Sequence, residues 1–183
     1  MRKELIKMNE ITMAELLFGS IDKTPEDYEA MYPKRDLPEG ARVTRFAPSP
    51  TGFLHFGSLF AAFIAAKTAG NDGVFYLRIE DTDKKREVEN GVIGMVNGLK
   101  DFGIVPSEGA LNETDECGNY GPYTQSRRNH IYHAYVKSLV ERGLAYPCFM
   151  TEEEIAKVRE AQEAVKALPG IYGEYAKYRD ISV

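Results

Sequence analysis

The stretch Arg45-Phe46-Ala47-Pro48-Ser49-Pro50-Thr51-Gly52-Phe53-Leu54-His55-Phe56-Gly57-Ser58 decides how this chain folds. It is typical of the end of a strand, then a tight loop rich in proline and glycine, then a helix that begins near Ser58. The first N–H groups of a helix lack partners within it and the helix dipole is positive there, so this junction attracts anions. His55 can hydrogen-bond a phosphate oxygen, and Gly57 lets a ligand approach bare backbone. We therefore expect a nucleotide phosphate at this loop.

The residues that flank the loop predict a parallel βαβ unit. Residues 43–47 are typical of a short strand, residues 59–69 of a helix and residues 74–79 of a second strand. Because the helix is apolar on nearly every side, we expect it to be buried, with Gly70 closing it. A strand, a crossover helix and a second strand in this order pair in parallel, so the predicted fold class is α/β.

An amphipathic helix is predicted over residues 84–102, where apolar side chains recur at helical spacing. Asp81 and Asp83 precede this helix. We expect these two acidic side chains to cap it and to interact favourably with its dipole, and a metal role is the weaker alternative.

The second half of the chain is predicted to be a loop followed by a helix, a strand and another helix. Ser126 is placed to cap the first of these helices. Thr151 and Glu154 have the spacing of a capping box at the start of the second. The predicted elements are a loop over residues 105–124, a helix over 126–142, a strand over 144–150 and a helix over 151–168.

Composition and charge narrow the class of protein. The 183 residues are 43% hydrophobic and 28% charged, as in ordinary globular proteins. A net charge of −5 argues against binding nucleic acid through bulk charge, but it leaves room for a local basic groove. Two cysteines cannot build a disulfide framework, so we expect a cytoplasmic protein. No apolar run is long enough to span a membrane, and we see no signal peptide.

Four segments in colinear order resemble the class I aminoacyl-tRNA synthetases, in their bacterial glutamyl form. Arg45–Gly52 followed by His55–Ser58 is similar to the "HIGH" signature, and Leu77–Asp83 resembles the second hallmark of that family. Tyr123–Ser126 and Ala145–Phe149 resemble two further segments. One HxGx element is shared with nucleotidylyltransferases, but an unrelated enzyme of that kind leaves most of these segments unexplained.

The resemblance implies a Rossmann-type catalytic domain and a reaction in two steps. ATP, accompanied by Mg²⁺, activates L-glutamate as glutamyl-adenylate, and the glutamyl group then passes to the 3′-terminal adenosine of tRNA. The tRNA is that for glutamate, and in some enzymes also that for glutamine. The implied domains are a helical N-terminal extension over residues 1–41, a Rossmann-type catalytic portion over 42–143, and over 144–183 the start of an α/β acceptor-binding insertion.

The resemblance also assigns roles to residues around the loop. His55 and Gly57 are the catalytic pair, because His55 donates to the α-phosphate region and Gly57 leaves room for adenosine. Arg45 binds a carboxylate of glutamate, which a guanidinium can grip through two parallel hydrogen bonds. Ser58 matches the fourth position of the signature or simply caps the helix. The implied ATP site comprises Ala47, Pro48, His55, Gly57 and Ser58, and the implied glutamate site comprises Arg45, Ala47, Ser49 and Glu80.

A basic segment is the candidate tRNA contact. Arg127, Arg128 and Lys137 lie on the predicted helix 126–142 and could offer a basic face to the tRNA acceptor end. Gln125 and Ser126, which belong to one of the four resembling segments, complete this candidate contact.

No zinc site is expected. Many relatives carry Cys-x-Cys at Cys148, but Met150 occupies the second position here, and a structural zinc needs four good ligands. We therefore expect Cys148 to be a small buried hydrophobe. His130 and His133 lie three residues apart, and we expect them on a solvated or half-buried helix face rather than in a metal site.

Nothing in the sequence matches the lysine-rich "KMSKS" loop that class I synthetases place over the ATP phosphates. We therefore expect the N-terminal part of a longer enzyme, inactive or weakly active alone, that needs its remaining part or an oligomer. Two alternatives stay open. One is an enzyme like the glutamyl-queuosine tRNA synthetases, which share the front motifs, and the other is a non-catalytic module that binds ATP or a tRNA acceptor end without turnover.

Overall fold

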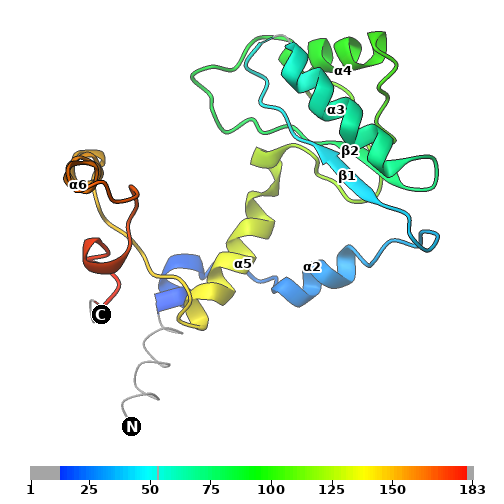
Figure 1. Cartoon of the computed structure of the whole chain (residues 1–183). Coiled ribbons are helices and arrows are strands. Elements are labelled where there is room, and N and C mark those ends of the chain that lie inside the picture. Colours follow the sequence, from blue (N-terminus) through cyan, green and yellow to red (C-terminus); the bar gives the residue numbers. More distant parts are fainter. Residues whose placement is uncertain (1–12, 53, 181–183) are drawn as a thin grey trace. The chain divides into compact units, whose positions relative to one another are not determined.

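The computed structural model describes residues 13–52 and 54–180 (Figure 1). The chain divides into two compact units, one formed by Pro25–Tyr132 and the other by the described parts of Met1–Thr24 and His133–Val183. The helix α5, Asn129–Glu141, begins in the first unit and continues into the second. In the described part of the chain no helix has the length and apolar character needed to cross a membrane.

The first unit is built on a four-stranded sheet in the order β1-β2-β3-β4. β1 (Val43–Phe46), β2 (Val74–Leu77) and β3 (Glu108–Ala110) are parallel, and β4 (Glu116–Cys117) is antiparallel to β3. The helix α3 (Phe56–Ala69) connects β1 to β2 and packs against both (Figure 1). The predicted α/β class and the parallel βαβ unit are confirmed.

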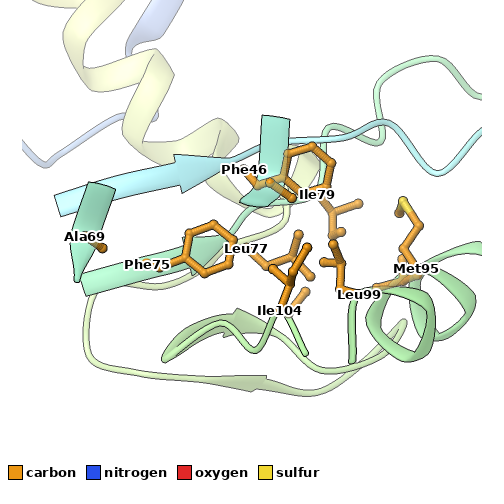
Figure 2. Close-up of a cluster of buried hydrophobic side chains, with 11 residues drawn as sticks. Phe46, Ala69, Phe75, Leu77, Ile79, Met95, Leu99 and Ile104 are labelled. Carbon is orange, nitrogen blue, oxygen red and sulfur yellow. The ribbon is translucent and has the colours of Figure 1, made fainter. Parts of the chain in front are cut away.

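The hydrophobic core lies between the sheet and the helices that connect its strands (Figure 2). Leu77 and Ile79, at the end of β2 and just beyond it, are almost fully buried. Leu99 of α4 (Gly91–Asp101) packs into the same cluster and is also fully buried. The core therefore sits directly beneath the loops that leave the strands. Its other members are Phe46, Ala62, Ala69, Phe75, Val92, Met95, Ile104 and Ala110.

The helix α3 differs from its prediction in two respects. It begins at Phe56, two residues before Ser58, and its N-cap is His55, so the expectation that Ser58 caps it is wrong. It is also not buried all round, because Ala62 and Ala69 face the sheet while Phe60 is 57% exposed. Small alanines let the helix approach the sheet closely, and no described segment covers the opposite, aromatic side. An apolar sequence predicts burial only where a second surface is available to pack against.

The helix α4 is shorter than predicted and is capped by a distant residue. It begins at Gly91, because Asn90 adopts a left-handed conformation with φ 56° and ends the preceding turn. The carboxylate of Glu113 accepts hydrogen bonds from the N–H groups of Val92 (3.0 Å) and Ile93 (3.3 Å). The expectation that Asp81 and Asp83 cap this helix is therefore wrong.

The region predicted as a loop over residues 105–124 contains β3 and β4. Both strands are too short to show an alternating pattern, and β3 contains Gly109 at φ 125°. A Cβ at Gly109 would lie only 2.2 Å from the carbonyl oxygen of Leu77, so this close approach of two strands requires glycine. A glycine within a strand weakens the sequence signal for that strand, which explains the error.

The second unit is helical where its structure is described. Residues 13–18 are helical, and the other elements are α5, α6 (Glu152–Ala164) and the short 3₁₀ helix η2 (Gly173–Tyr175). The predicted capping box is confirmed, because Glu154 N donates to Thr151 Oγ1 (3.2 Å) and Thr151 N donates to Glu154 Oε2 (2.7 Å). The predicted strand over residues 144–150 is wrong. That segment pairs with no strand among the described residues, and strand propensity needs a partner.

The N-terminal extension is fastened to the sheet by Arg35. Its guanidinium donates to both carboxylate oxygens of Glu108 on β3, at 2.5 and 2.7 Å, and lies 3.7 Å from the ring centre of Tyr120. The hydroxyl of Tyr123 donates to the same carboxylate at 2.6 Å, and that of Tyr120 donates to the carbonyl of Pro33 at 2.8 Å. Residues 33–35 therefore belong to the same packed unit as the sheet. The helix α2 (Pro25–Met31) precedes them in that unit.

This cluster shifts the pKa values of its members. The hydrogen bonds from Arg35 lower the pKa of Glu108 and outweigh the opposing effect of burial. Burial, and then the hydrogen bond to Glu108, raise the pKa of Tyr123 to about 12. The carboxylate is therefore ionised and the phenol neutral at pH 7, as the two hydrogen bonds require.

Substitution of Arg35 by alanine is expected to destabilise the first unit by roughly 2 to 3 kcal/mol, because the Glu108 carboxylate, 16% exposed, would keep only Tyr123 as a partner. Arg86→Ala is the matched control, since Arg86 is 71% exposed and its ion pair with Asp83 contributes little. Urea unfolding followed by tyrosine fluorescence measures both, because the chain has no tryptophan. Equal losses for the two variants would contradict this assignment.

Acid is expected to destabilise the protein through Glu108 and Asp81, whose pKa values are lowered from 4.5 and 3.8 respectively. A carboxyl with a lowered pKa in the folded state contributes stability that is present above its ordinary pKa and lost as the pH falls through the folded value. The free energy of unfolding should therefore fall as the pH drops below about 4.5. Glu108→Gln should reduce the slope in that range, and an unchanged slope would contradict the role of this residue.

Candidate nucleotide and amino-acid binding site

Two loops leave the same edge of the sheet and are joined by backbone hydrogen bonds. β1 and β2 are parallel, with Phe46 opposite Leu77, so the segments that follow them emerge side by side. Beyond the strands, Arg78 N donates to Phe46 O (2.9 Å) and Glu80 N donates to Pro48 O (3.0 Å). The carboxyl ends of parallel strands are where open α/β sheets bind ligands. Most of the predicted ATP and glutamate residues lie on these two segments.

His55 ends the segment that follows β1 and caps the N-terminus of α3. Its Nδ1 accepts a hydrogen bond from Ser58 N (3.3 Å), and its Nε2 lies 3.0 Å from Ser58 Oγ. An Nδ1 that accepts carries no proton, so the neutral ring carries its proton on Nε2. His55 is exposed, so its Nε2–H, which now lies next to Ser58 Oγ, can instead donate to an anion.

Gly57 lies against the ring of His55, where a side chain would be in tight contact. A Cβ at this position would lie 3.0 Å from Cε1 and 3.1 Å from Nδ1 of His55. These distances are shorter than ordinary van der Waals contacts, so a side chain at position 57 would push the imidazole away from the helix. The sequence interpretation of Gly57 considered only space for a ligand, and the structure adds this local steric reason.

Arg45 projects from β1 on the face opposite to α3. On the neighbouring positions of the strand, Thr44 Oγ1 donates to Ala65 O of α3 (2.8 Å) and Phe46 enters the core. Side chains alternate along a strand, so Arg45 points to the other face. Its guanidinium is exposed and has no hydrogen-bond or ion-pair partner among residues 13–52 and 54–180. Such a cation is free to bind an anionic ligand.

Glu80 is half-buried, and within the described part of the chain its carboxylate has no partner either. No contact joins Glu80 to Arg45 in these same residues, so the two opposite charges do not neutralise each other. Of the other predicted ligands, Ala47 and Pro48 are half-buried and Ser49 is exposed. A free cation near the end of β1 and a free anion just beyond the parallel strand β2 suit a ligand that carries both charges, such as an amino acid.

Asp81 and Asp83 hold local structure beyond β2. Asp81 accepts hydrogen bonds from Ser126 N (2.9 Å), Ser126 Oγ (2.5 Å) and Lys84 Nζ (3.2 Å). Asp83 accepts from Arg86 Nε at 2.6 Å. Sequence reasoning missed the bond between Asp81 and Ser126, because 45 residues separate them and no local pattern connects them.

The segment predicted to contact tRNA forms the 3₁₀ helix η1 (Gln125–Arg128), so the expectation that Ser126 caps a helix is wrong. Its two arginines have partners within the unit. Arg127 donates to the carbonyls of Glu113 (2.6 Å) and Thr114 (3.0 Å), and Arg128 donates to that of Pro122 (2.7 Å).

In the second unit, Lys137 pairs with Glu15 at 2.8 Å. The role of Arg127, Arg128 and Lys137 in tRNA binding stays a prediction, and their bonds within the protein would compete with contacts to tRNA.

The residues considered for metal binding are dispersed. Cys148 is exposed, so the expectation of a buried residue is wrong, because the segment around it forms no strand that could pack it. His130 lies beside the ring of Tyr28, and His133 lies beside that of Phe18. Within the described ranges no three His, Cys, Asp or Glu residues are arranged to hold a metal ion. The expected absence of zinc stays a prediction.

A cavity of about 80 Å³ lies away from these loops. Its lining includes Lys100 of α4, Glu108 of β3 and Cys117 of β4. The cavity is far smaller than the roughly 300 Å³ that a small-molecule site usually needs. It is therefore not the nucleotide site.

Comparison with known proteins identifies close relatives. The chain is 56% identical over 171 residues to the glutamate–tRNA ligase of Clostridium perfringens, which covers 93% of this chain and 31% of that protein. It is 47% identical over 139 residues to the glutamate–tRNA ligase of Bacillus subtilis, which covers 75% of this chain and 27% of that protein. The chain thus spans about a third of the length of these relatives.

Among solved structures, the crystal structure of a glutamate tRNA ligase from Elizabethkingia meningosepticum in complex with its amino acid is similar, with a TM-score of 0.59 and 39% identity. The match covers 71% of this chain and 25% of that one. The model of the family "tRNA synthetases class I (E and Q), catalytic domain" matches residues 42–176, which include the segments that follow β1 and β2, and η1. The chain therefore belongs to the class I tRNA synthetases of the glutamate and glutamine type.

Proposed function

We propose that this chain is the catalytic front part of a glutamate–tRNA ligase. The observation that carries the proposal is the pair of unpartnered opposite charges at the carboxyl ends of two paired strands. Arg45 lies near the end of β1, whose following segment leads to the His55-capped start of α3, and Glu80 lies just beyond β2. The names of the relatives support it, and so does the match of the catalytic-domain family to residues 42–176.

In the first step, a carboxylate oxygen of glutamate attacks the α-phosphorus of ATP, and the bond to the departing pyrophosphate breaks. Negative charge builds on the α-phosphate as this happens. The Nε2–H of His55 and the N–H groups at the start of α3 are placed to stabilise that charge. Mg²⁺ bound to the phosphates would neutralise part of the charge of the nucleotide. The remaining contribution of the chain is to hold the two substrates in line.

Glutamate is bound by complementary charge in this proposal. Arg45 binds the carboxylate that does not react, and Glu80 accepts hydrogen bonds from the α-ammonium group. In the second step a hydroxyl of the 3′-terminal adenosine of tRNA attacks the glutamyl carbonyl and AMP leaves. The proposed tRNA contacts are Gln125, Ser126, Arg127 and Arg128. The tRNA is that for glutamate, or also that for glutamine.

We place the protein in the cytoplasm, which agrees with two free cysteines.

Arg45→Ala is expected to raise the Kd for glutamate roughly 100-fold, because two charge-assisted hydrogen bonds are lost, and to leave the Kd for ATP nearly unchanged. Isothermal titration of each ligand measures both values. Arg42→Ala is the matched control, since Arg42 is an exposed arginine just before the other end of β1.

The activity itself is tested by exchange of labelled pyrophosphate into ATP with glutamate and tRNA present. Exchange that depends on glutamate supports the ligase. Binding of ATP or tRNA without pyrophosphate exchange would support a non-catalytic module instead. An equal loss of affinity for glutamate and for ATP in Arg45→Ala would count against the proposed glutamate site.

Gly57→Ala is expected to slow exchange roughly 10- to 100-fold, because its methyl group displaces the His55 ring. In a His55→Ala background the same change should have little further effect, since no ring remains to be displaced. Gly94→Ala in α4 is the control, because a Cβ there meets no atom within 4 Å. An equal effect of Gly57→Ala in both backgrounds would show that the glycine acts only by making space for the nucleotide.

A further inference from the structure

Asp81 is a buried charged residue that the proposed reaction does not use. It is 6% exposed, and its two oxygens together accept three hydrogen bonds. Burial by itself would raise the pKa of Asp81, but the hydrogen bonds from Ser126 and Lys84 outweigh it and lower the pKa. The side chain is therefore a buried carboxylate with a defined set of donors.

The main chain on either side of Glu80 is held by hydrogen bonds. Glu80 N itself donates to Pro48 O at 3.0 Å. Before it, Ile79 N donates to Tyr123 O (3.0 Å) and Ile79 O accepts from Gln125 N (2.8 Å). After it, the carboxylate of Asp81 binds Ser126. Glu80 thus lies between two residues that are both tied to the segment 123–126.

The segment 123–126 is itself fixed from its other side. Glu116 of β4 accepts hydrogen bonds from Thr124 N (3.1 Å), Thr124 Oγ1 (3.0 Å) and Tyr123 N (3.0 Å). The segment is therefore a rigid support and not a loose loop, and a residue tied to it inherits a defined position.

We propose that Asp81 is a positioning residue that fixes Glu80 for the amino group of the substrate by tying residues 79–81 to Ser126. The inference rests on the proposed function, because Glu80 receives its role there. Asp81 touches neither substrate in this scheme and acts only through the main chain. Aspartate suits the task because one oxygen accepts from the Ser126 amide and the other from the Ser126 hydroxyl, whereas the Nδ2 of asparagine cannot accept.

The first measurement needs no ligand and tests the clamp alone. Hydrogen exchange of the backbone amides of Glu80 and Ser126, followed by NMR, should be faster in Asp81→Asn than in the unchanged chain. The amides of β1, which Asp81 does not touch, should be unaffected. Lys84→Met is the matched control, because it removes only the 60%-exposed partner of Asp81 and should leave both amides protected. Unchanged exchange at Glu80 in Asp81→Asn would overturn the proposal.

The second measurement tests the consequence for binding. Asp81→Asn should raise the Kd for glutamate about tenfold, with the Kd for ATP unchanged. Ser126→Ala should raise the Kd for glutamate by a smaller factor. The double variant should bind glutamate no more weakly than Asp81→Asn, because both changes act on the same contact between Asp81 and Ser126.

The outcomes separate this inference from the proposed function. Equal weakening of glutamate and ATP binding, in step with a fall in melting temperature, would show a merely structural role and overturn the inference. If the wild-type chain binds no glutamate, the proposed function is overturned, and with it the role of Glu80. That conclusion would hold even if hydrogen exchange at Glu80 is faster in Asp81→Asn.

Discussion

Two backbone hydrogen bonds, from Arg78 N to Phe46 O and from Glu80 N to Pro48 O, join the ends of β1 and β2 and the segments that follow them. They continue the pairing of β1 and β2 past the ends of the strands. Parallel strands bring their carboxyl ends to one edge, and this continuation, together with a hydrogen bond from Val88 N to Pro50 O (2.9 Å), keeps the two segments in contact after the strands have ended. The charges of Arg45 and Glu80 can serve one small ligand because the main chains that carry them are joined.

Carboxylates organise the rest of the unit around these loops. Asp81, Glu113 and Glu116 each accept hydrogen bonds from backbone N–H groups of other segments, and Glu108 accepts from the side chains of Arg35 and Tyr123. A carboxylate offers about four acceptor positions, so one side chain can satisfy several backbone N–H groups at once. Short strands and tight turns leave many such groups unpaired, and these residues supply what a larger sheet would supply through its ladder.

Local patterns predicted the parts of the fold that depend on neighbours in sequence. The strand at 43–47, the crossover helix and the capping box of Thr151 and Glu154 are encoded within a few residues each. The errors at the start of α4 and at residues 144–150 share one cause, which is dependence on a distant partner. The start of α4 depends on Glu113, and the strand expected at 144–150 lacks a neighbour to pair with among the described residues. The motif residues were found because they are contiguous, while the bond between Asp81 and Ser126 leaves no local trace.

The His55–Ser58 signature shows how four residues can prepare an anion site. Nδ1 of His55 accepts from the N–H of Ser58, so one N–H group of the helix end has a partner before any ligand arrives. A neutral imidazole is a weaker partner for a helix N-terminus than an anion, which also gains from the dipole. In the proposed function a phosphate would compete with the ring for the Ser58 N–H, and the exposed Nε2–H would be available to donate to an anion. Gly57 contributes to this arrangement because a Cβ there would lie 3.0 Å from Cε1 and 3.1 Å from Nδ1 of the ring, which would have to shift to admit it.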